Sequence, residues 1–290
     1  MKKKLLLTLL LGLALCLLAA CGSAPVEDAP EPEPAAEEDV AEPAAEPVEL
    51  YVFAAASMNA ALPEIAGAYA AVAPETELVF TFDSSGTLKT QITEGAYCDI
   101  FISAGQKQMN AIDKANTEVN TDGLDYILSD TRFNLLENQI VLVVPADNPA
   151  DIQSFDDLAT DKLSLLAIGN ADVPVGQYAA EILTWMDVYD SLNNAGRITF
   201  GANTTEVTSQ VSEGAVDCGI VYKTDVASSV NPDSLAIVAA APEGSVSRAI
   251  YPAAIVNVSE NVDAAQAFLD FLRGDEAKAI LESYGFSTEF

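Results

Sequence analysis

Four short segments have residue types that could hold an anion, because each places small or hydroxyl-bearing residues between a predicted strand and a predicted helix. A helix that begins there directs free backbone N–H groups, and the positive end of its dipole, at whatever lies in front of it. Each segment alone has a simpler explanation, since Ser and Thr are common N-caps and Gly and Pro are common in loops. Only their joint occurrence indicates more. The four segments are Ala54-Ala55-Ala56-Ser57, Asp83-Ser84-Ser85-Gly86-Thr87, Val173-Pro174-Val175-Gly176 and Asn203-Thr204-Thr205-Glu206-Val207.

The sequence lacks the residue types and motifs that many enzymes use for catalysis. There is no His, which removes the commonest general base and a frequent metal ligand. We find no Gly-x-Ser-x-Gly elbow, no Cys-x-x-Cys pair, no phosphate loop ending in Gly-Lys-Ser/Thr and no Gly-x-Gly-x-x-Gly after a strand. Carboxylates are abundant, but no two of them stand out as an acid and a base. The chain is therefore predicted not to be an enzyme, to need no cofactor and to offer no direct metal ligands.

The elements that must position these segments alternate between strand and helix. Strand patterns occupy residues 50–53, 78–82 and 100–103, and helix patterns occupy 60–72, 87–94 and 107–115. This order is the βαβ signature of a parallel sheet covered on both faces. We expect it to form a first α/β lobe.

A second stretch of the same kind begins at residue 140. Strands are predicted at 140–145, 163–168, 220–222 and 253–258, with helices at 179–187 and 207–212 and two closing helices at 262–273 and 276–284. The fold expected is two α/β lobes joined by a two-crossing hinge, with the ligand cleft between them. The predicted boundaries give residues 49–138 and 257–290 to lobe 1 and residues 139–256 to lobe 2.

The N-terminal residues predict export and a lipid anchor. Three lysines precede the apolar run 5–18, which is shorter than the roughly 20 residues that a membrane-spanning helix needs. The run ends at Leu18-Ala19-Ala20-Cys21, which resembles the lipobox of bacterial lipoproteins. Residues 1–20 are thus interpreted as a lipoprotein signal peptide, with Cys21 as the lipidated residue. Residues 21–48, rich in Pro, Ala and acidic side chains, are interpreted as a disordered tether.

The net charge limits which molecules the protein can bind, and the sequence around the remaining cysteines indicates their redox state. The net charge of −31 gives a surface that repels nucleic acid and anionic lipid, so no nucleic-acid partner is expected. Cys98 and Cys218 each precede an apolar strand pattern, and we expect both to be buried free thiols rather than a disulfide.

The anion-binding segments resemble those of the molybdate-binding proteins of ABC importers, within the class of two-lobed periplasmic binding proteins. The resemblance extends in order from residue 50 to the C-terminus. It implies a monomeric protein held at the outer face of the cell membrane, which delivers molybdate or tungstate to an ABC permease and its ATPase. It also implies anion contacts from Ser57 and Ser85 through hydroxyl and N–H, from Val175 and Val207 through N–H, and from the Tyr222 phenol. The similar segments are residues 52–57, 84–88, 99–104, 106–109, 173–179, 219–225, 251–252 and 284–286.

Two residues depart from the family pattern. Asp83 stands where the family has a small residue; its carboxylate would repel molybdate but could accept the proton of a protonated phosphate. Pro63 falls in the first predicted helix and would bend it unless regular helix begins there. A phosphate or sulfate receptor on the same scaffold is therefore the main alternative. An extracellular enzyme and an adhesive lipoprotein are the alternatives from other classes.

Overall fold

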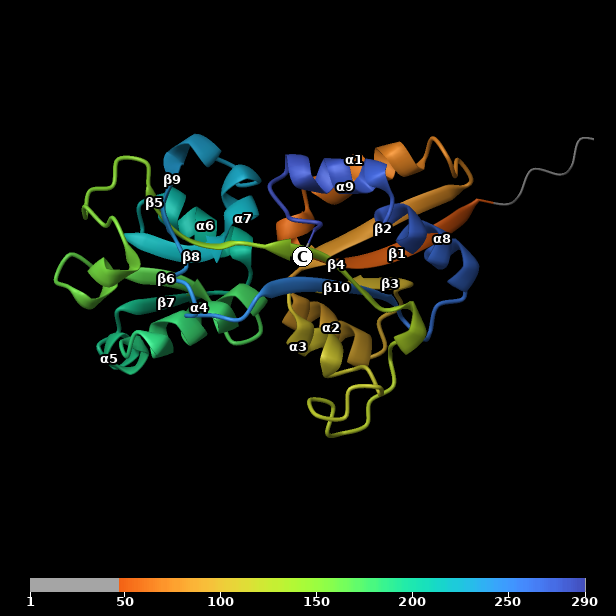
Figure 1. Ribbon diagram of the computed structural model, residues 1–290, viewed down its shortest axis with the longest axis horizontal. Coiled ribbons are helices and arrows are strands. Elements are labelled where there is room, and N and C mark those ends of the chain that lie inside the picture. Colours follow the sequence, from red (N-terminus) through yellow and green to blue (C-terminus); the bar gives the residue numbers. More distant parts are fainter. Residues whose placement is uncertain (1–46, 290) are drawn as a thin grey trace, which may run out of the picture. The chain divides into compact units, whose positions relative to one another are not determined.

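The structure, a computed structural model, describes residues 47–289. The expected signal peptide, Cys21 and all but the last two residues of the expected tether lie outside this range. The described residues belong to one compact unit, which contains two five-stranded sheets (Figure 1). No helix within residues 47–289 is both long enough and apolar enough to cross a bilayer.

The first lobe takes its elements from both ends of the described chain. They are β1 (Val48–Ala55), α1 (Ala61–Tyr69), β2 (Thr76–Asp83), α2 (Ser85–Thr93), β3 (Ile100–Ile102), α3 (Gln106–Asn110), β4 (Phe133–Asn138), β10 (Ala249–Ile255), α8 (Val262–Leu272) and α9 (Asp275–Ser283). The strand order is β2-β1-β3-β10-β4, with β10 antiparallel to both of its neighbours. Leu50 and Val52 of β1 share a hydrophobic cluster with α1 and α8, whereas Phe53 packs with α2 on the other face. Helices therefore cover both faces of the first sheet, as the predicted βαβ order indicated.

The second lobe repeats this arrangement. It contains β5 (Ile140–Pro145), β6 (Leu166–Gly169), α4 (Pro174–Trp185), α5 (Tyr189–Asn194), β7 (Ile198–Gly201), α6 (Thr204–Ser212), β8 (Cys218–Tyr222), α7 (Lys223–Ala227) and β9 (Leu235–Ala240). The strand order is β7-β6-β8-β5-β9, with β5 antiparallel to β8 and β9. Two α/β lobes are thus confirmed.

The lobe boundary at residue 256 is wrong. β10 pairs with β3 and β4, so Ala249–Ile255 belongs to the first sheet and the second crossing comes before Ala249. The sheets are also mixed rather than purely parallel. The chain changes sheet between β4 and β5 and again between β9 and β10. The first strand after each crossing, β5 or β10, runs against the direction of the parallel core.

Several local expectations are settled by the structure. Cys98 and Cys218 are buried free thiols, as predicted. Pro63 is the third residue of α1, in the first turn, where a missing N–H costs nothing. The helix expected at 107–115 ends at Asn110, and the strands β4, β7 and β9 were not predicted.

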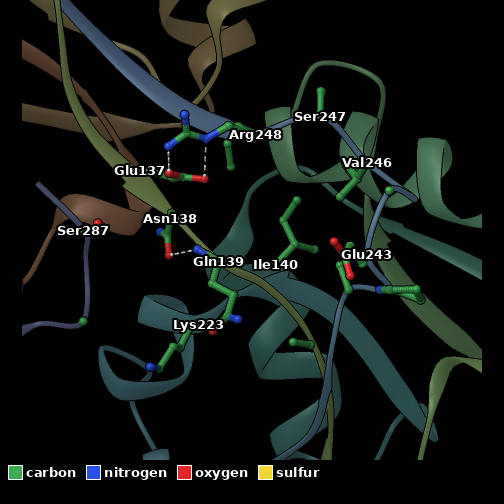
Figure 2. Close-up of a pocket in the computed structure, with 16 residues that line it drawn as sticks. Glu137, Asn138, Gln139, Ile140, Lys223, Glu243, Val246, Ser247, Arg248 and Ser287 are labelled. Atoms are coloured by element: carbon green, nitrogen blue, oxygen red, sulfur yellow. Dashed lines mark hydrogen bonds and ion pairs between the residues drawn. The ribbon is translucent and has the colours of Figure 1, made fainter. Parts of the chain in front are cut away.

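A pocket of about 480 Å³ lies between the two crossings. Asn138, Gln139 and Ile140 line it from the first crossing and Arg248 from the second, and Lys223 of the second lobe also lines it (Figure 2). The Arg248 guanidinium binds the Glu137 carboxylate through both of its oxygens. This ion pair ties the end of the second crossing to the start of the first.

Candidate anion-binding site

Ser57 and Ser85 lie at the carboxyl ends of neighbouring strands. Ala55 of β1 is paired with Asp83 of β2, so the residues that follow the two strands are brought side by side. Ser57 is in a 3₁₀ turn (Ala56–Met58) and Ser85 is the first residue of α2, and both are buried. The structure therefore places both predicted serines together at the edge of the sheet where α/β proteins bind ligands.

Ser85 keeps its own hydrogen-bond donors for a ligand. Its Oγ accepts a hydrogen bond from the Ala104 N–H at 2.9 Å, which leaves the hydroxyl proton to be donated elsewhere. The next two N–H groups of α2 are already used: Gly86 donates to the Asp172 carbonyl at 3.0 Å and Thr87 to the Ser84 Oγ at 3.1 Å. The Ser85 N–H is the first-turn donor of α2 for which the described chain supplies no acceptor.

The second lobe presents the N-terminus of α4. Pro174 is the first helical residue and has no N–H, so the Val175 N–H is the first donor of this helix. Val175 is fully buried, and first-turn N–H groups have no acceptor within their own helix. Val175 therefore lies at a buried helix end, because α4 begins at Pro174 and not at residue 179 as predicted.

Val207 is not placed as predicted. The helix expected to begin at Val207 begins at Thr204, so the Val207 N–H bonds to the Asn203 carbonyl inside α6 and its side chain packs in the core of the second lobe. The buried donor in the first turn of α6 is Thr204. Asn203 provides the cap, accepting the Glu206 N–H at 3.0 Å, and this cap moves the start of the helix three residues earlier.

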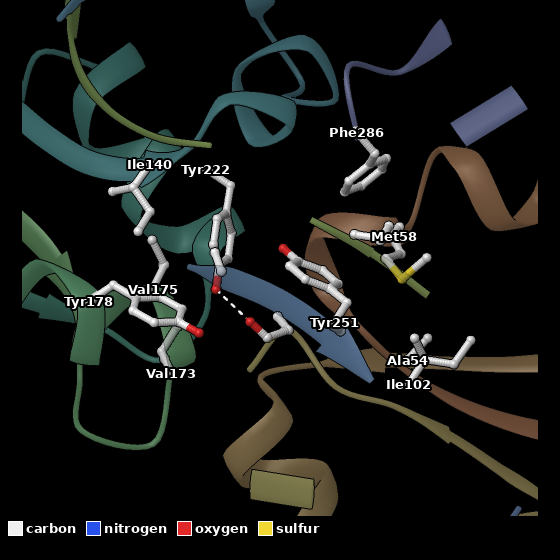
Figure 3. Close-up of a cluster of buried hydrophobic side chains, with 14 of the residues drawn as sticks. Ala54, Met58, Ile102, Ile140, Val173, Val175, Tyr178, Tyr222, Tyr251 and Phe286 are labelled. Carbon is white, nitrogen blue, oxygen red and sulfur yellow. Dashed lines mark hydrogen bonds between the residues drawn. The ribbon is translucent and has the colours of Figure 1, made fainter. Parts of the chain in front are cut away.

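Tyr222 ends β8 and is fully buried. Its hydroxyl donates to the Ala104 carbonyl of the first lobe at 2.8 Å (Figure 3). Burial, followed by the neighbouring Tyr251, raises the pKa of Tyr222 well above its ordinary value, so the phenol remains a donor. A hydrogen bond from Tyr222 to an anion would require its proton to leave Ala104.

A buried polar chain connects Ser57 to the hinge. Its Oγ lies 2.9 Å from the Tyr251 hydroxyl. The side-chain amide of Asn138, at the first crossing, donates to the Tyr251 hydroxyl at 3.1 Å and to the Thr224 hydroxyl of the second lobe at 2.8 Å. These hydrogen-bonded side chains thus connect the site to both lobes, and none of them carries a formal charge.

Two carboxylates lie near these donors. Asp83 accepts the Ser84 N–H at 2.7 Å, so it faces the start of α2. Asp225, which sequence reasoning missed, is buried in α7 and accepts the Tyr222 N–H at 2.9 Å. Burial raises the pKa of Asp225 to about 7, while the hydrogen bond from the Tyr222 N–H and the nearby Thr204 hydroxyl oppose the rise. Only its position three residues after Tyr222, as in a capping box, could have signalled it.

Comparisons with known proteins match the part of the chain that the structure describes. A family model described as bacterial extracellular solute-binding protein matches residues 50–287. The Molybdate-binding protein ModA of Haemophilus influenzae is 36% identical over 82% of this chain and 89% of its own length. The putative ABC transporter substrate-binding lipoprotein YvgL of Bacillus subtilis is 34% identical over 83% of this chain and 87% of its own length.

Solved structures agree with these sequence relatives. The substrate-binding domain of a putative molybdenum ABC transporter from Clostridium difficile is 36% identical to this chain, with a TM-score of 0.63 over 84% of this chain and 100% of that domain. The periplasmic molybdate-binding protein of Azotobacter vinelandii has a TM-score of 0.70 at 24% identity, over 83% of this chain and 100% of its own, and supports the fold.

Proposed function

Since the chain belongs to the family of bacterial extracellular solute-binding proteins and is related within it to the molybdate-binding proteins, we propose that it captures molybdate or tungstate for an ABC import permease. Membership in this family makes the chain a binding protein rather than an enzyme, as the absence of His and of nucleophile motifs predicted. The permease and its ATPase are the proposed partners, and the protein is proposed to act as a monomer.

The observation that supports this anion is the set of neutral donors that converge from two lobes. Ser57 and Ser85 come from the first sheet, and the helix ends at Val175 and Thr204 come from the second. Tyr222 lies between the lobes and contacts Ala104. Hydrogen bonds to a charged group contribute roughly 1.5–3 kcal/mol each, so several donors can hold an oxyanion without Lys or Arg.

Anion selectivity tests the proposal. Molybdate and tungstate have longer bonds to oxygen than sulfate has, so donors fixed for the larger anions leave sulfate with stretched hydrogen bonds. Phosphate carries a proton at neutral pH that a site made only of donors cannot accept. In calorimetric titrations we expect molybdate and tungstate to bind within about tenfold of each other, and sulfate and phosphate at least about 100-fold more weakly.

Asp83 is the residue that could reverse this preference. Displacement of molybdate by phosphate at comparable concentration, and loss of that displacement in Asp83→Ala, would establish a phosphate receptor instead. If none of the four anions binds, the assignment to oxyanion transport is wrong.

Attachment to the membrane through Cys21 is a separate part of the proposal. The lipobox-like residues before Cys21 support it, as does the relative named as a lipoprotein. Cys21→Ser should move the protein from the membrane fraction into the soluble extracytoplasmic fraction. A Cys21→Ser protein that is processed normally and stays in the membrane fraction would rule out the anchor.

A further inference from the structure

Gly86 and Asp172 meet across the boundary between the lobes. Gly86 is the second residue of α2, directly after Ser85, and Asp172 is in the loop between β6 and α4, three residues before Val175. The Gly86 N–H donates to the Asp172 carbonyl at 3.0 Å. The contact therefore joins the two helix ends that carry the proposed anion donors.

The contact leaves no room for a side chain at residue 86. A Cβ added to Gly86 would lie 2.1 Å from the Asp172 carbonyl oxygen and 2.7 Å from the Asp172 Cβ. The backbone at Gly86 is ordinary α-helix, not the left-handed conformation that favours glycine. Ala is a better helix former than Gly, so local structure alone would favour Ala here.

The Asp172 side of the contact is held in place. The Asp172 N–H donates to the Asn170 side chain at 2.8 Å, and the Val173 N–H donates to the Asn170 carbonyl at 3.0 Å. The Gln177 side chain donates to the Ala171 carbonyl at 2.6 Å. Because the loop is anchored within its own lobe, the clash between a side chain at residue 86 and Asp172 would be relieved by separating the lobes.

We propose that Gly86 is a positioning residue for anion retention: the absence of its side chain, together with the hydrogen bond to Asp172, lets the two lobes close fully on the ligand. The proposal rests on the proposed function, because it concerns closure of the same site. When closure is incomplete, the donors of one lobe lie too far from an anion held by the other. Release of the anion then becomes faster, whereas entry is little affected.

The test compares three glycine-to-alanine variants with different space around the new Cβ. Gly86→Ala introduces the clash. Gly67→Ala is the matched control, since Gly67 is also in a helix but has nothing within 4 Å of an added Cβ. Gly105→Ala is intermediate, because its Cβ would lie 3.1 Å from the Pro174 Cβ of the second lobe.

For Gly86→Ala we expect molybdate to bind at least about tenfold more weakly, because the dissociation rate increases while the association rate stays nearly the same. We also expect small-angle X-ray scattering to show a smaller contraction of the protein on ligand binding. The melting temperature without ligand should equal or exceed that of the wild type. Gly105→Ala should show a smaller loss of affinity and Gly67→Ala none.

Three outcomes would overturn the proposal. Wild-type affinity and dissociation rate in Gly86→Ala would show that the contact does not limit closure. A ligand-free Gly86→Ala protein that melts several degrees below the wild type would show that Gly86 serves the fold. If the wild type binds no oxyanion, the proposed function fails as well; if the wild type binds and the variant is unaffected, only the role of Gly86 fails.

Discussion

Ser85 can give an anion two hydrogen bonds, one from its N–H and one from its hydroxyl. The Ala104 N–H already occupies an Oγ acceptor position, which favours the hydroxyl proton pointing away from Ala104. Ser85→Ala should keep the helix and the N–H but weaken molybdate binding by roughly 10–100-fold, the contribution of one hydrogen bond to a charged group. Calorimetric titration measures this loss, and Ser191→Ala on the exposed face of α5 is the control. Equal affinities in the two variants would exclude the Ser85 hydroxyl from the site.

Asp225 should make the stability of the protein depend on pH. Its pKa is raised to about 7 in the folded state, so between pH 4 and 7 the folded protein binds more protons than the unfolded chain. Stability therefore falls as pH rises through this window, by up to about 4 kcal/mol. Asp225→Asn keeps an oxygen for the Tyr222 N–H and removes the charge.

In Asp225→Asn the decline in melting temperature between pH 5 and pH 8 should be smaller, and the variant should be the more stable protein at pH 8. Thermal unfolding at the two pH values measures both. Parallel declines in the variant and the wild type would show that Asp225 does not titrate in this range.

The sequence predicted some of these residues and missed others for physical reasons. Ser57, Ser85 and Val175 follow a strand and precede or begin a helix, and local pattern is enough to show this. Val207 was wrong because the N-cap was not assigned to Asn203. Asp225 was missed because its burial depends on packing between distant segments, and the sequence does not distinguish it from the many exposed carboxylates.

At the scale of elements, the start of α6 determines which N–H faces the proposed anion site. Asn203→Ala removes the acceptor for the Glu206 N–H, and the loss of such a cap costs about 1 kcal/mol. It should also weaken molybdate binding several-fold, because the frayed first turn no longer fixes the Thr204 N–H.

Asn203→Ser is the matched control, since Ser is also a good N-cap and should restore both properties. Urea unfolding and calorimetric titration give the two values. A stability loss without any loss of affinity would show that α6 does not contribute to the site.

Sheet membership is also a property of elements, and the sequence could not assign it for β10. A strand of apolar residues such as 249–255 could pair with strands of either sheet. Its partners Ile102 and Leu136 are more than 100 residues away in the chain. The parallel strands were easier, because each is followed by its own helix. The crossings therefore produced the errors in the lobe boundary.

At the scale of the whole molecule, polar contacts at the hinge connect the two lobes. Asn138 binds Tyr251 and Thr224, and Tyr251 in turn contacts Ser57. One hydrophobic cluster also runs from the first sheet through Tyr251 and Tyr222 into the second (Figure 3). The two-lobed architecture followed from the alternation of strands and helices, but this shared core depends on long-range packing.

Each lobe contains one buried thiol, whose reaction with an alkylating reagent reports the unfolding of that lobe. Cys98 packs in the first lobe and Cys218 begins β8 of the second, and neither is exposed. Burial raises the pKa of Cys98 to about 12 and that of Cys218 further, so neither is a thiolate at neutral pH. Alkylation must therefore wait for local or global unfolding.

In a chain that begins at residue 47, pulsed alkylation followed by mass spectrometry should modify Cys98 and Cys218 together if the lobes unfold as one cooperative unit. Modification of one thiol before the other would identify the lobe that opens first. Molybdate should slow the labelling of both thiols, because a ligand clamped between two lobes holds each of them shut.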